Sequence, residues 1–189
     1  MASTYDKIVK AAGALFYREG VRAVSVDRVA EKAGITKRSL YYHFNSKDDL
    51  IAAYLEARDR PNLAAFEAWF TGAPGNAADK VAAIFTHLGA AASSASWKGC
   101  GFLRTSAELV ATPGHPAIRV ATRHKQQFEQ WLTAALAALG VASADLLARQ
   151  IRLLMDGAFA VILLNRDSSY MASAGHAAET LVRLRLEGN

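Results

Sequence analysis

Two short helical segments joined by a tight turn impose the strongest constraint on the fold of this chain. Ser25 is suited to cap the first segment, and Gly34 follows its last apolar residue. Thr36, only two residues later, is suited to cap the second segment, which Asn45 and Ser46 end. Because a short turn with a glycine is typical of two helices packed at a steep angle, the sequence predicts a helix-turn-helix.

The rest of the chain is also predicted to be helical. Alanine and leucine recur throughout, and runs typical of strands are missing. A first helix is expected between the capping box Ser3-Thr4-Tyr5-Asp6 and Gly20. Later helices are expected from Ser46 toward Arg60, where Pro61 kinks or restarts the helix, then through Val81–Leu88 and over about 102–110, 117–139, 144–165 and 169–186. We therefore expect an all-α fold of about nine helices.

Positive charge is concentrated in the predicted helix-turn-helix. The 189 residues include 22 Lys and Arg against 17 Asp and Glu, which gives a formal net charge of +5. Residues 32–47 contain no acid and four cations, Lys32, Lys37, Arg38 and Lys47. This distribution favours an anionic partner for this segment.

The second helix of the pair has two different faces. At 100° per residue, Leu40 and Phe44 lie together and can pack on the preceding helix. A different face carries Arg38, Ser39, Tyr42 and His43. A charged helix face is more often simply solvated, but an exposed tyrosine is unusual there. These residue types also hydrogen-bond phosphates and base edges.

Together these segments resemble the DNA-binding domain of the TetR family of transcriptional regulators. The resemblance rests on GITKRSLYYHF at 34–44, SKDDL at 46–50, SVDRVAEKA at 25–33 and the first helix at 8–20, which ends LFYREG. It covers about residues 5–55, and beyond them only the helical architecture is similar. The resemblance implies a helix-turn-helix DNA-binding domain at 1–46 and a larger effector-binding and dimerisation domain at 47–189.

The resemblance implies DNA contacts for nine residues. Those expected to face the major groove are Lys37, Arg38, Ser39 and Tyr42. The second helix of the pair is called the recognition helix. The residues expected at phosphates, or at the start of this helix, are Ser25, Thr36, Tyr41, His43 and Lys47. The family often has a small residue or proline where Arg38 stands. Because arginine can bind guanine in bidentate fashion, we expect Arg38 to contact a base.

The resemblance also implies a mechanism and partners. A homodimer would place two recognition helices about one DNA turn apart, roughly 34–36 Å, on a palindromic operator. A small-molecule effector would change that spacing and release the DNA, so that the chain acts as a repressor. The last two helices are apolar over much of their circumference, which favours them as the dimer interface over a role in the core alone.

Aromatic side chains of the larger domain favour an apolar or aromatic effector, although each one alone is more often a core residue. The expected pocket residues are Trp69, Phe85, Leu88, Phe102, Ser106, Phe128, Trp131 and Phe159. Glu108 is expected to pair with Arg104, four residues earlier, more than with a cationic effector.

Other functions receive less support. No nucleophile elbow, glycine-rich phosphate loop or paired-carboxylate motif occurs, so we expect neither an enzyme nor a cofactor. The scattered histidines lack metal-ligand spacing and are expected to be solvated or capping residues. The one cysteine, Cys100, fits a reducing compartment and leaves a redox role open. With no signal-like or membrane-length apolar run, a cytoplasmic protein without membrane contact is expected.

Two rival functions remain: a helical ligand carrier or enzyme with an incidental basic segment, and an architectural DNA-binding protein without an effector. DNA binding that depends on Lys37 and Tyr42 would exclude the first. Release from the operator by a small molecule would exclude the second. The sequence does not specify the effector, the operator, the regulated genes or whether the chain represses or activates them.

Overall fold

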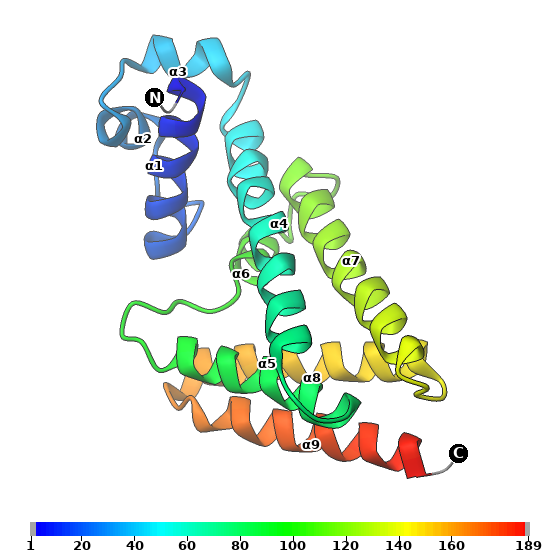
Figure 1. Ribbon diagram of the computed structural model, residues 1–189. Helices are drawn as coiled ribbons and strands as arrows, with labels where there is room; N and C mark the ends of the chain where they lie inside the picture. Colours follow the sequence, from blue (N-terminus) through cyan, green and yellow to red (C-terminus); the bar gives the residue numbers. More distant parts are fainter. Residues whose placement is uncertain (1–2, 188–189) are drawn as a thin grey trace. The chain divides into compact units, whose positions relative to one another are not determined.

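The computed structural model describes residues 3–187, and their regular structure is helical (Figure 1). Over this range the helices are α1 (Thr4–Glu19), α2 (Val26–Ala33), α3 (Lys37–His43), α4 (Lys47–Gly72), α5 (Ala77–Ala92), α6 (Gly101–Glu108), α7 (Pro116–Ala138), α8 (Ala144–Asn165) and α9 (Ser169–Glu187). The predicted all-α fold of about nine helices is confirmed for the described residues.

The chain forms two compact units. The first unit comprises the chain up to Pro61 together with Cys100–His124, and the second comprises Asn62–Gly99 together with the chain from Lys125 on. The helices α4 and α7 therefore contribute to both units, whereas α6 belongs to the first. These compact units are not the two functional domains expected from the sequence, whose boundary lies between residues 46 and 47. That boundary stays a prediction.

Local capping fixes the first helix. The backbone N–H of Asp6 donates to Ser3 Oγ, and the backbone N–H of Ser3 donates to the Asp6 carboxylate, each at 3.1 Å. This reciprocal pair is the predicted capping box. At the other end Gly20 closes α1 with φ of 92°, a conformation that L side chains rarely adopt.

The turn between α2 and α3 also follows from local chemistry. Gly34 ends α2 in the left-handed conformation, and its N–H donates to the carbonyls of Ala30 and Glu31. Two residues later, Thr36 Oγ1 accepts a hydrogen bond from Ser39 N at 3.1 Å and caps α3. The two helices are therefore separated by three residues, as a helix-turn-helix requires.

The core of the first unit anchors α3 from within. Leu40 is fully buried beside Val29 of α2 and Ile8 of α1 in one apolar cluster. Phe44, directly after α3, is also buried and stacks on the ring of Tyr5 with 5.1 Å between centroids. The predicted inner face of α3 is confirmed.

In the second unit, α9 packs against both α5 and α8. Gly175 on α9 allows α9 to approach α5 closely, because a Cβ there would lie 2.7 Å from Phe85 Cβ.

The helix α4 does not end at Pro61. This proline lies within the helix although it offers no N–H to the carbonyl one turn earlier. No described helix has both the length and the hydropathy to cross a bilayer.

Candidate nucleic-acid interface

The outward face of α3 presents the side chains that the sequence assigned to DNA. Tyr42 is 87% exposed and Tyr41 44%, and Lys37, Arg38 and His43 are exposed as well. The rings of Tyr42 and His43 stand perpendicular, 5.4 Å apart. Since Leu40 of the same helix is fully buried, α3 is held from one side and open on the other.

The two cations at the start of α3 have different surroundings. Lys37 Nζ lies 3.0 Å from the Asp27 carboxylate, and this hydrogen bond raises the pKa of Lys37. The exposed side chain of Arg38 forms no hydrogen bond or ion pair with any residue in the described part of the chain. An anion can therefore meet Arg38 directly, whereas Lys37 must exchange Asp27 for a new partner.

Two further predicted phosphate contacts flank α3. Ser25 is exposed and caps α2, with its Oγ accepting a hydrogen bond from Arg28 N at 3.3 Å. Its hydroxyl proton remains available at a helix N-terminus, where backbone N–H groups also favour anions. Lys47 is half-buried, its Nζ donates to Arg22 O at 3.4 Å, and this burial lowers its pKa.

Side chains of α6 hold the end of α1 and its connection to α2. Glu108 Oε2 accepts a hydrogen bond from Arg22 N at 3.0 Å, and Arg104 donates to Tyr17 O at 2.8 Å. The predicted Glu108–Arg104 pair is therefore wrong, because both side chains find backbone partners more than 80 residues away in the sequence. The sequence did not predict that Glu108 and Arg104 position the end of α1. The only signal of such a role was that Glu108 is an acid among apolar neighbours.

A carboxylate pairs α1 with α2 next to this connection. Glu19 accepts hydrogen bonds from both ends of the Arg28 guanidinium at 2.6 and 3.1 Å and also pairs with Arg18. The hydrogen bond from Arg28, and to a smaller extent the one from Arg18, lowers the pKa of Glu19 to about 2. The helix that precedes the recognition helix is thus tied to α1 by a charge-assisted pair.

Two histidines at or beside the start of α7 lie close to acidic residues of α4 within the first unit. His115 Nδ1 accepts a hydrogen bond from Ala117 N at 3.0 Å, so this histidine caps the start of α7. Its Nε2 lies 3.2 Å from Asp48 Oδ1 but outside hydrogen-bonding geometry. His124 is buried, with Nδ1 2.7 Å from Asp59 Oδ1. The prediction that the histidines are solvated or capping is met at His115 and wrong at His124.

The eight predicted effector residues are divided between the units. Phe102 and Ser106 lie on α6 in the first unit, where the Phe102 ring stacks on His124 at 3.7 Å. The other six lie in the second unit: Trp69, Phe85, Leu88, Phe128, Trp131 and Phe159. Of these, Phe128 and Trp131 are brought together, with 5.8 Å between centroids, and Trp69 stacks on His87 at 5.0 Å.

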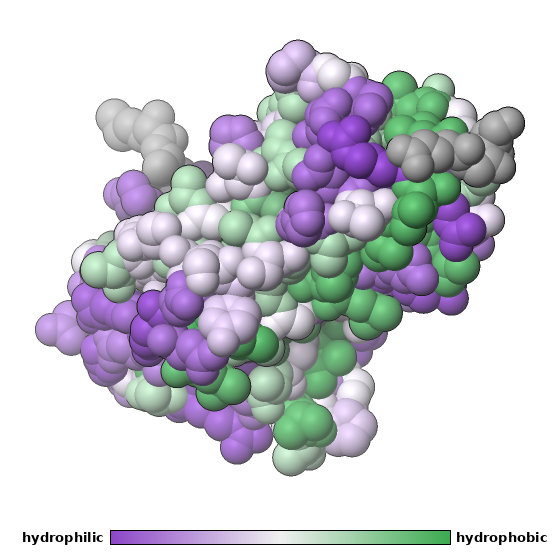
Figure 2. Space-filling model, turned by 90° about the horizontal axis from the view of Figure 1, so that it is seen from below, coloured by the Kyte–Doolittle hydropathy of each residue, from purple (hydrophilic) through white to green (hydrophobic). Residues whose placement is uncertain are grey.

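A second exposed face lies along α8 and α9. It is hollowed by a groove of about 860 Å³ whose apolar lining includes Leu153, Leu154, Val161, Ala174 and Leu181. Leu153 is 66% exposed and Tyr170, also in the lining, 40%. In the view from below, Figure 2 shows hydrophobic residues forming connected areas among the hydrophilic ones.

Comparison with known proteins places similarity over both units. The profile of bacterial regulatory proteins of the tetR family matches residues 8–54. The crystal structure of SCO4454, a TetR-family transcriptional regulator from Streptomyces coelicolor, aligns with a TM-score of 0.85 and 31% identity over 97% of this chain and 90% of that one. A TetR-type regulator from Streptomyces avermitilis aligns with a TM-score of 0.77 and 29% identity, over 94% and 99% of the two chains.

Curated relatives match over the helix-turn-helix region. The regulator SrpR of Pseudomonas putida is 38% identical over 58 residues, which are 31% of this chain and 27% of SrpR. The repressor KstR2 of Mycolicibacterium smegmatis is 37% identical over 54 residues, 29% of this chain and 26% of KstR2. The chain thus matches little more than a quarter of the length of these relatives.

Proposed function

The chain belongs to the TetR family of DNA-binding transcriptional regulators, and on that premise we propose that it is a repressor that binds a palindromic operator as a homodimer and is released by a small apolar or aromatic effector. The outward face of α3 is the observation that carries this proposal. Lys37, Arg38 and Tyr42 are exposed there, while Leu40 fixes the helix from within. A rigid helix with exposed cations and a tyrosine is suited to the major groove.

In this proposal residues 1–46 bind DNA and residues 47–189 bind the effector and form the dimer. The side chains in the major groove are Lys37, Arg38, Ser39 and Tyr42. The contacts to phosphates come from Ser25, Tyr41, His43 and Lys47, and Thr36 contacts DNA at the start of α3. Arg38 has no partner in the described chain, which supports its assignment to a base, most simply to guanine through two hydrogen bonds.

The dimer interface of this proposal is the exposed face of α8 and α9. Leu153 stands 66% exposed beside a groove lined mainly by apolar side chains. Apolar surface gathered in one place marks an interaction site more often than apolar residues scattered singly. A second copy of the same face would cover it symmetrically and bring two recognition helices to one palindrome.

The effector of this proposal binds mainly in the second unit, which holds six of the eight expected pocket residues and a cluster of contacting aromatic rings. Phe128 contacts both Phe66 and Trp131, with centroids 4.9 and 5.8 Å apart, and Phe70 also meets Trp131. Such a cluster favours a flat apolar molecule over a sugar or a nucleotide. An effector that prefers the DNA-free conformation weakens operator binding by the same factor by which DNA weakens effector binding.

Two measurements on the purified protein test this proposal. Selection of sites from random DNA is expected to give a palindrome whose half-sites lie about 10 base pairs apart, centre to centre. Mass spectrometry of retained small molecules then supplies candidate effectors, each tested for release of that operator. Replacing both Lys37 and Tyr42 with alanine should abolish selection, whereas Arg60→Ala, which removes an exposed arginine of α4, should not.

Two outcomes would contradict the proposal. Failure to select any DNA sequence would favour a carrier or an enzyme with an incidental basic segment. Selection of a site that none of the retained molecules releases would favour an architectural DNA-binding protein.

A further inference from the structure

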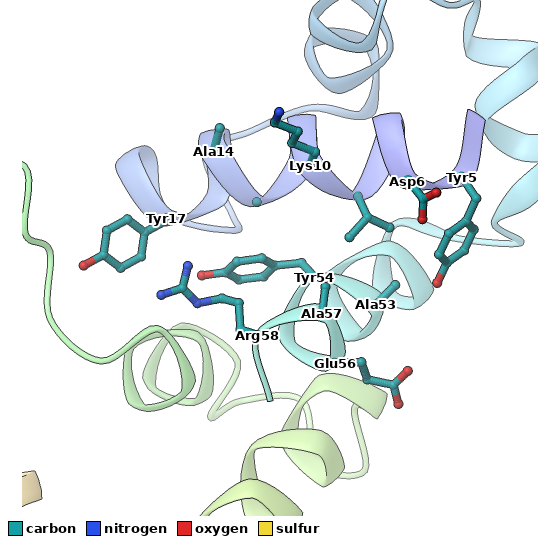
Figure 3. Close-up of a pocket in the computed structure, with 12 residues that line it drawn as sticks. Tyr5, Asp6, Lys10, Ala14, Tyr17, Ala53, Tyr54, Glu56, Ala57 and Arg58 are labelled. Carbon is teal, nitrogen blue, oxygen red and sulfur yellow. The ribbon is translucent and has the colours of Figure 1, made fainter. Parts of the chain in front are cut away.

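A groove of about 650 Å³ lies within the first unit, between α1 and α4 (Figure 3). Its apolar lining is made largely of small side chains, with Val9 and Gly13 on α1 and Ala53 and Ala57 on α4. The ring of Tyr54 also lines it. Small side chains along both helices leave room for a flat molecule between them.

Arg58 stands at one end of this groove without an acidic partner. Figure 3 shows its guanidinium beside the rings of Tyr17 and Tyr54, whose centroids lie 4.9 and 5.9 Å from the guanidinium carbon. Its Nε is buried and has no hydrogen-bond acceptor, and Arg58 forms no ion pair with any described residue. This nitrogen is covered by the neighbourhood of Gly101, where an added Cβ would lie 3.5 Å from it. The two terminal nitrogens of the guanidinium are not among the buried unpartnered atoms, so they are the donors that an anion in the groove can meet.

The carboxylates that line the groove already have partners. Asp6 accepts hydrogen bonds from the backbone N–H and hydroxyl of Ser3, at the end away from Arg58 in Figure 3. Glu56 accepts a hydrogen bond from Arg123 at 3.4 Å. Lys10, also in the lining, forms no ion pair with the described residues. Both cations of the groove are therefore open to an anion.

Gly13 adds an independent indication of a site. Glycine weakens the middle of a helix relative to alanine. A Cβ at this position would lie 3.5 Å from Tyr54 Cδ2, an ordinary contact, so the packing of α1 on α4 does not require glycine. The effect of Gly13 is to keep the lining of the groove open next to Tyr54.

We propose that this groove binds an aromatic carboxylate, with the carboxylate on Arg58 and the ring between Gly13 and Ala57. The planar fork of arginine matches a carboxylate through two parallel hydrogen bonds. Burial raises the pKa of Tyr54 to about 12, so its hydroxyl stays protonated beside the bound anion. This site belongs to the first unit and is additional to the effector site proposed for the second.

Calorimetric titration without DNA tests this site, with 2-naphthoate as the probe and neutral 2-naphthamide as its isostere. Naphthoate is expected to bind at one molecule per chain, at least tenfold more tightly than the amide. Arg58→Met keeps the apolar stem and removes the charge, and should weaken naphthoate at least tenfold while leaving the amide unchanged. Arg60→Met removes an exposed arginine from the same helix and should change neither affinity.

A second variant distinguishes loss of ligand binding from loss of the fold, in case Arg58→Met destabilises the protein. Ala57→Leu adds bulk at an exposed position of the groove and leaves Arg58 intact, so both probes should lose affinity while the Tm stays the same. The proposal is overturned if naphthoate does not bind at millimolar concentration, if acid and amide bind equally, or if binding survives both Arg58→Met and Ala57→Leu. Because DNA is absent, these outcomes are independent of whether the chain represses transcription.

Discussion

The outer face of α3 and the outer face of α8 and α9 are both exposed but differ in chemistry. On α3 the exposed groups are cations, tyrosines and a histidine, all of which can hydrogen-bond water. On α8 and α9 the groove is lined mainly by leucine, valine and alanine, with Leu153 66% exposed. Water satisfies the first face in the free protein, whereas the second gains free energy whenever another apolar surface covers it.

This difference in chemistry indicates which kind of partner each face binds. The α3 face gains from a polyanion, because phosphates replace water at its cations and release counterions. The α8–α9 face gains from an apolar surface of similar shape. Substitutions that remove charge from one face and add it to the other separate the two roles.

The largest effect is expected from a charge placed on the apolar face. Leu153→Glu should weaken self-association at least about 100-fold, since an unpaired carboxylate in an apolar interface costs about 3 kcal/mol or more. Operator binding should fall with it, because one subunit reaches only one half-site. Sedimentation velocity and operator titration measure the two losses.

The control for this variant is Val110→Glu, which adds the same charge at a position that is 77% exposed in the first unit. Val110→Glu should keep the Tm of the parent chain, since this side chain is not buried. Leu153→Glu should keep the helical content of the parent chain by circular dichroism, and its Tm should fall only by the stabilisation that association supplies. If Leu153→Glu remains as dimeric as the parent, α8 and α9 are not the interface.

An intermediate effect is expected on the polar face. Arg38→Ala should weaken binding to the selected operator by about 10- to 100-fold and relax the preference at one base pair, as the loss of a bidentate guanine contact implies. Titration of operators that vary at each position measures both changes. Arg60→Ala removes the same charge from an exposed position of α4 and should leave the base preference intact.

A different result would reassign Arg38. Equal weakening on every DNA sequence, with the slope of log affinity against log salt reduced by about one, would make it a phosphate contact.

The smallest effect concerns the partner that holds Lys37 in the free protein. Asp27→Asn removes the carboxylate 3.0 Å from Lys37 Nζ and should strengthen DNA binding about two- to fivefold on all sequences. The reason is that Lys37 no longer exchanges a protein partner for a phosphate. Asp167→Asn, an equal change of charge in the second unit, serves as the control, and weaker binding by Asp27→Asn would instead make Asp27 a support for Lys37.

Helix ends were predictable where a side chain closes the backbone locally. Ser3, Ser25 and Thr36 accept the hydrogen bonds that their positions in the sequence predict, and Gly34 adopts the left-handed conformation. Each of these contacts spans only a few residues, so the sequence contains all of its participants. The inner and outer faces of α3 follow in the same way from its helical period.

Contacts between distant segments were not predictable from spacing. Glu108 was expected to meet Arg104 one turn away, but it accepts a hydrogen bond from Arg22, 86 residues earlier. The groove at Arg58 likewise requires α1 to lie beside α4, which no local pattern specifies. The eight residues expected to line one effector pocket are divided between two units. Spacing along the chain does not specify which helices pack together.

The length of α3 has a consequence for gene control. Seven residues are too few for a helix to persist alone in water, where even 12–15 are marginal. The recognition helix therefore exists only while the first unit is folded around Leu40 and Phe44. Heat-sensitive regulation is the expected phenotype of substitutions at such buried positions, because the exposed face of α3 is lost as soon as the fold around it melts.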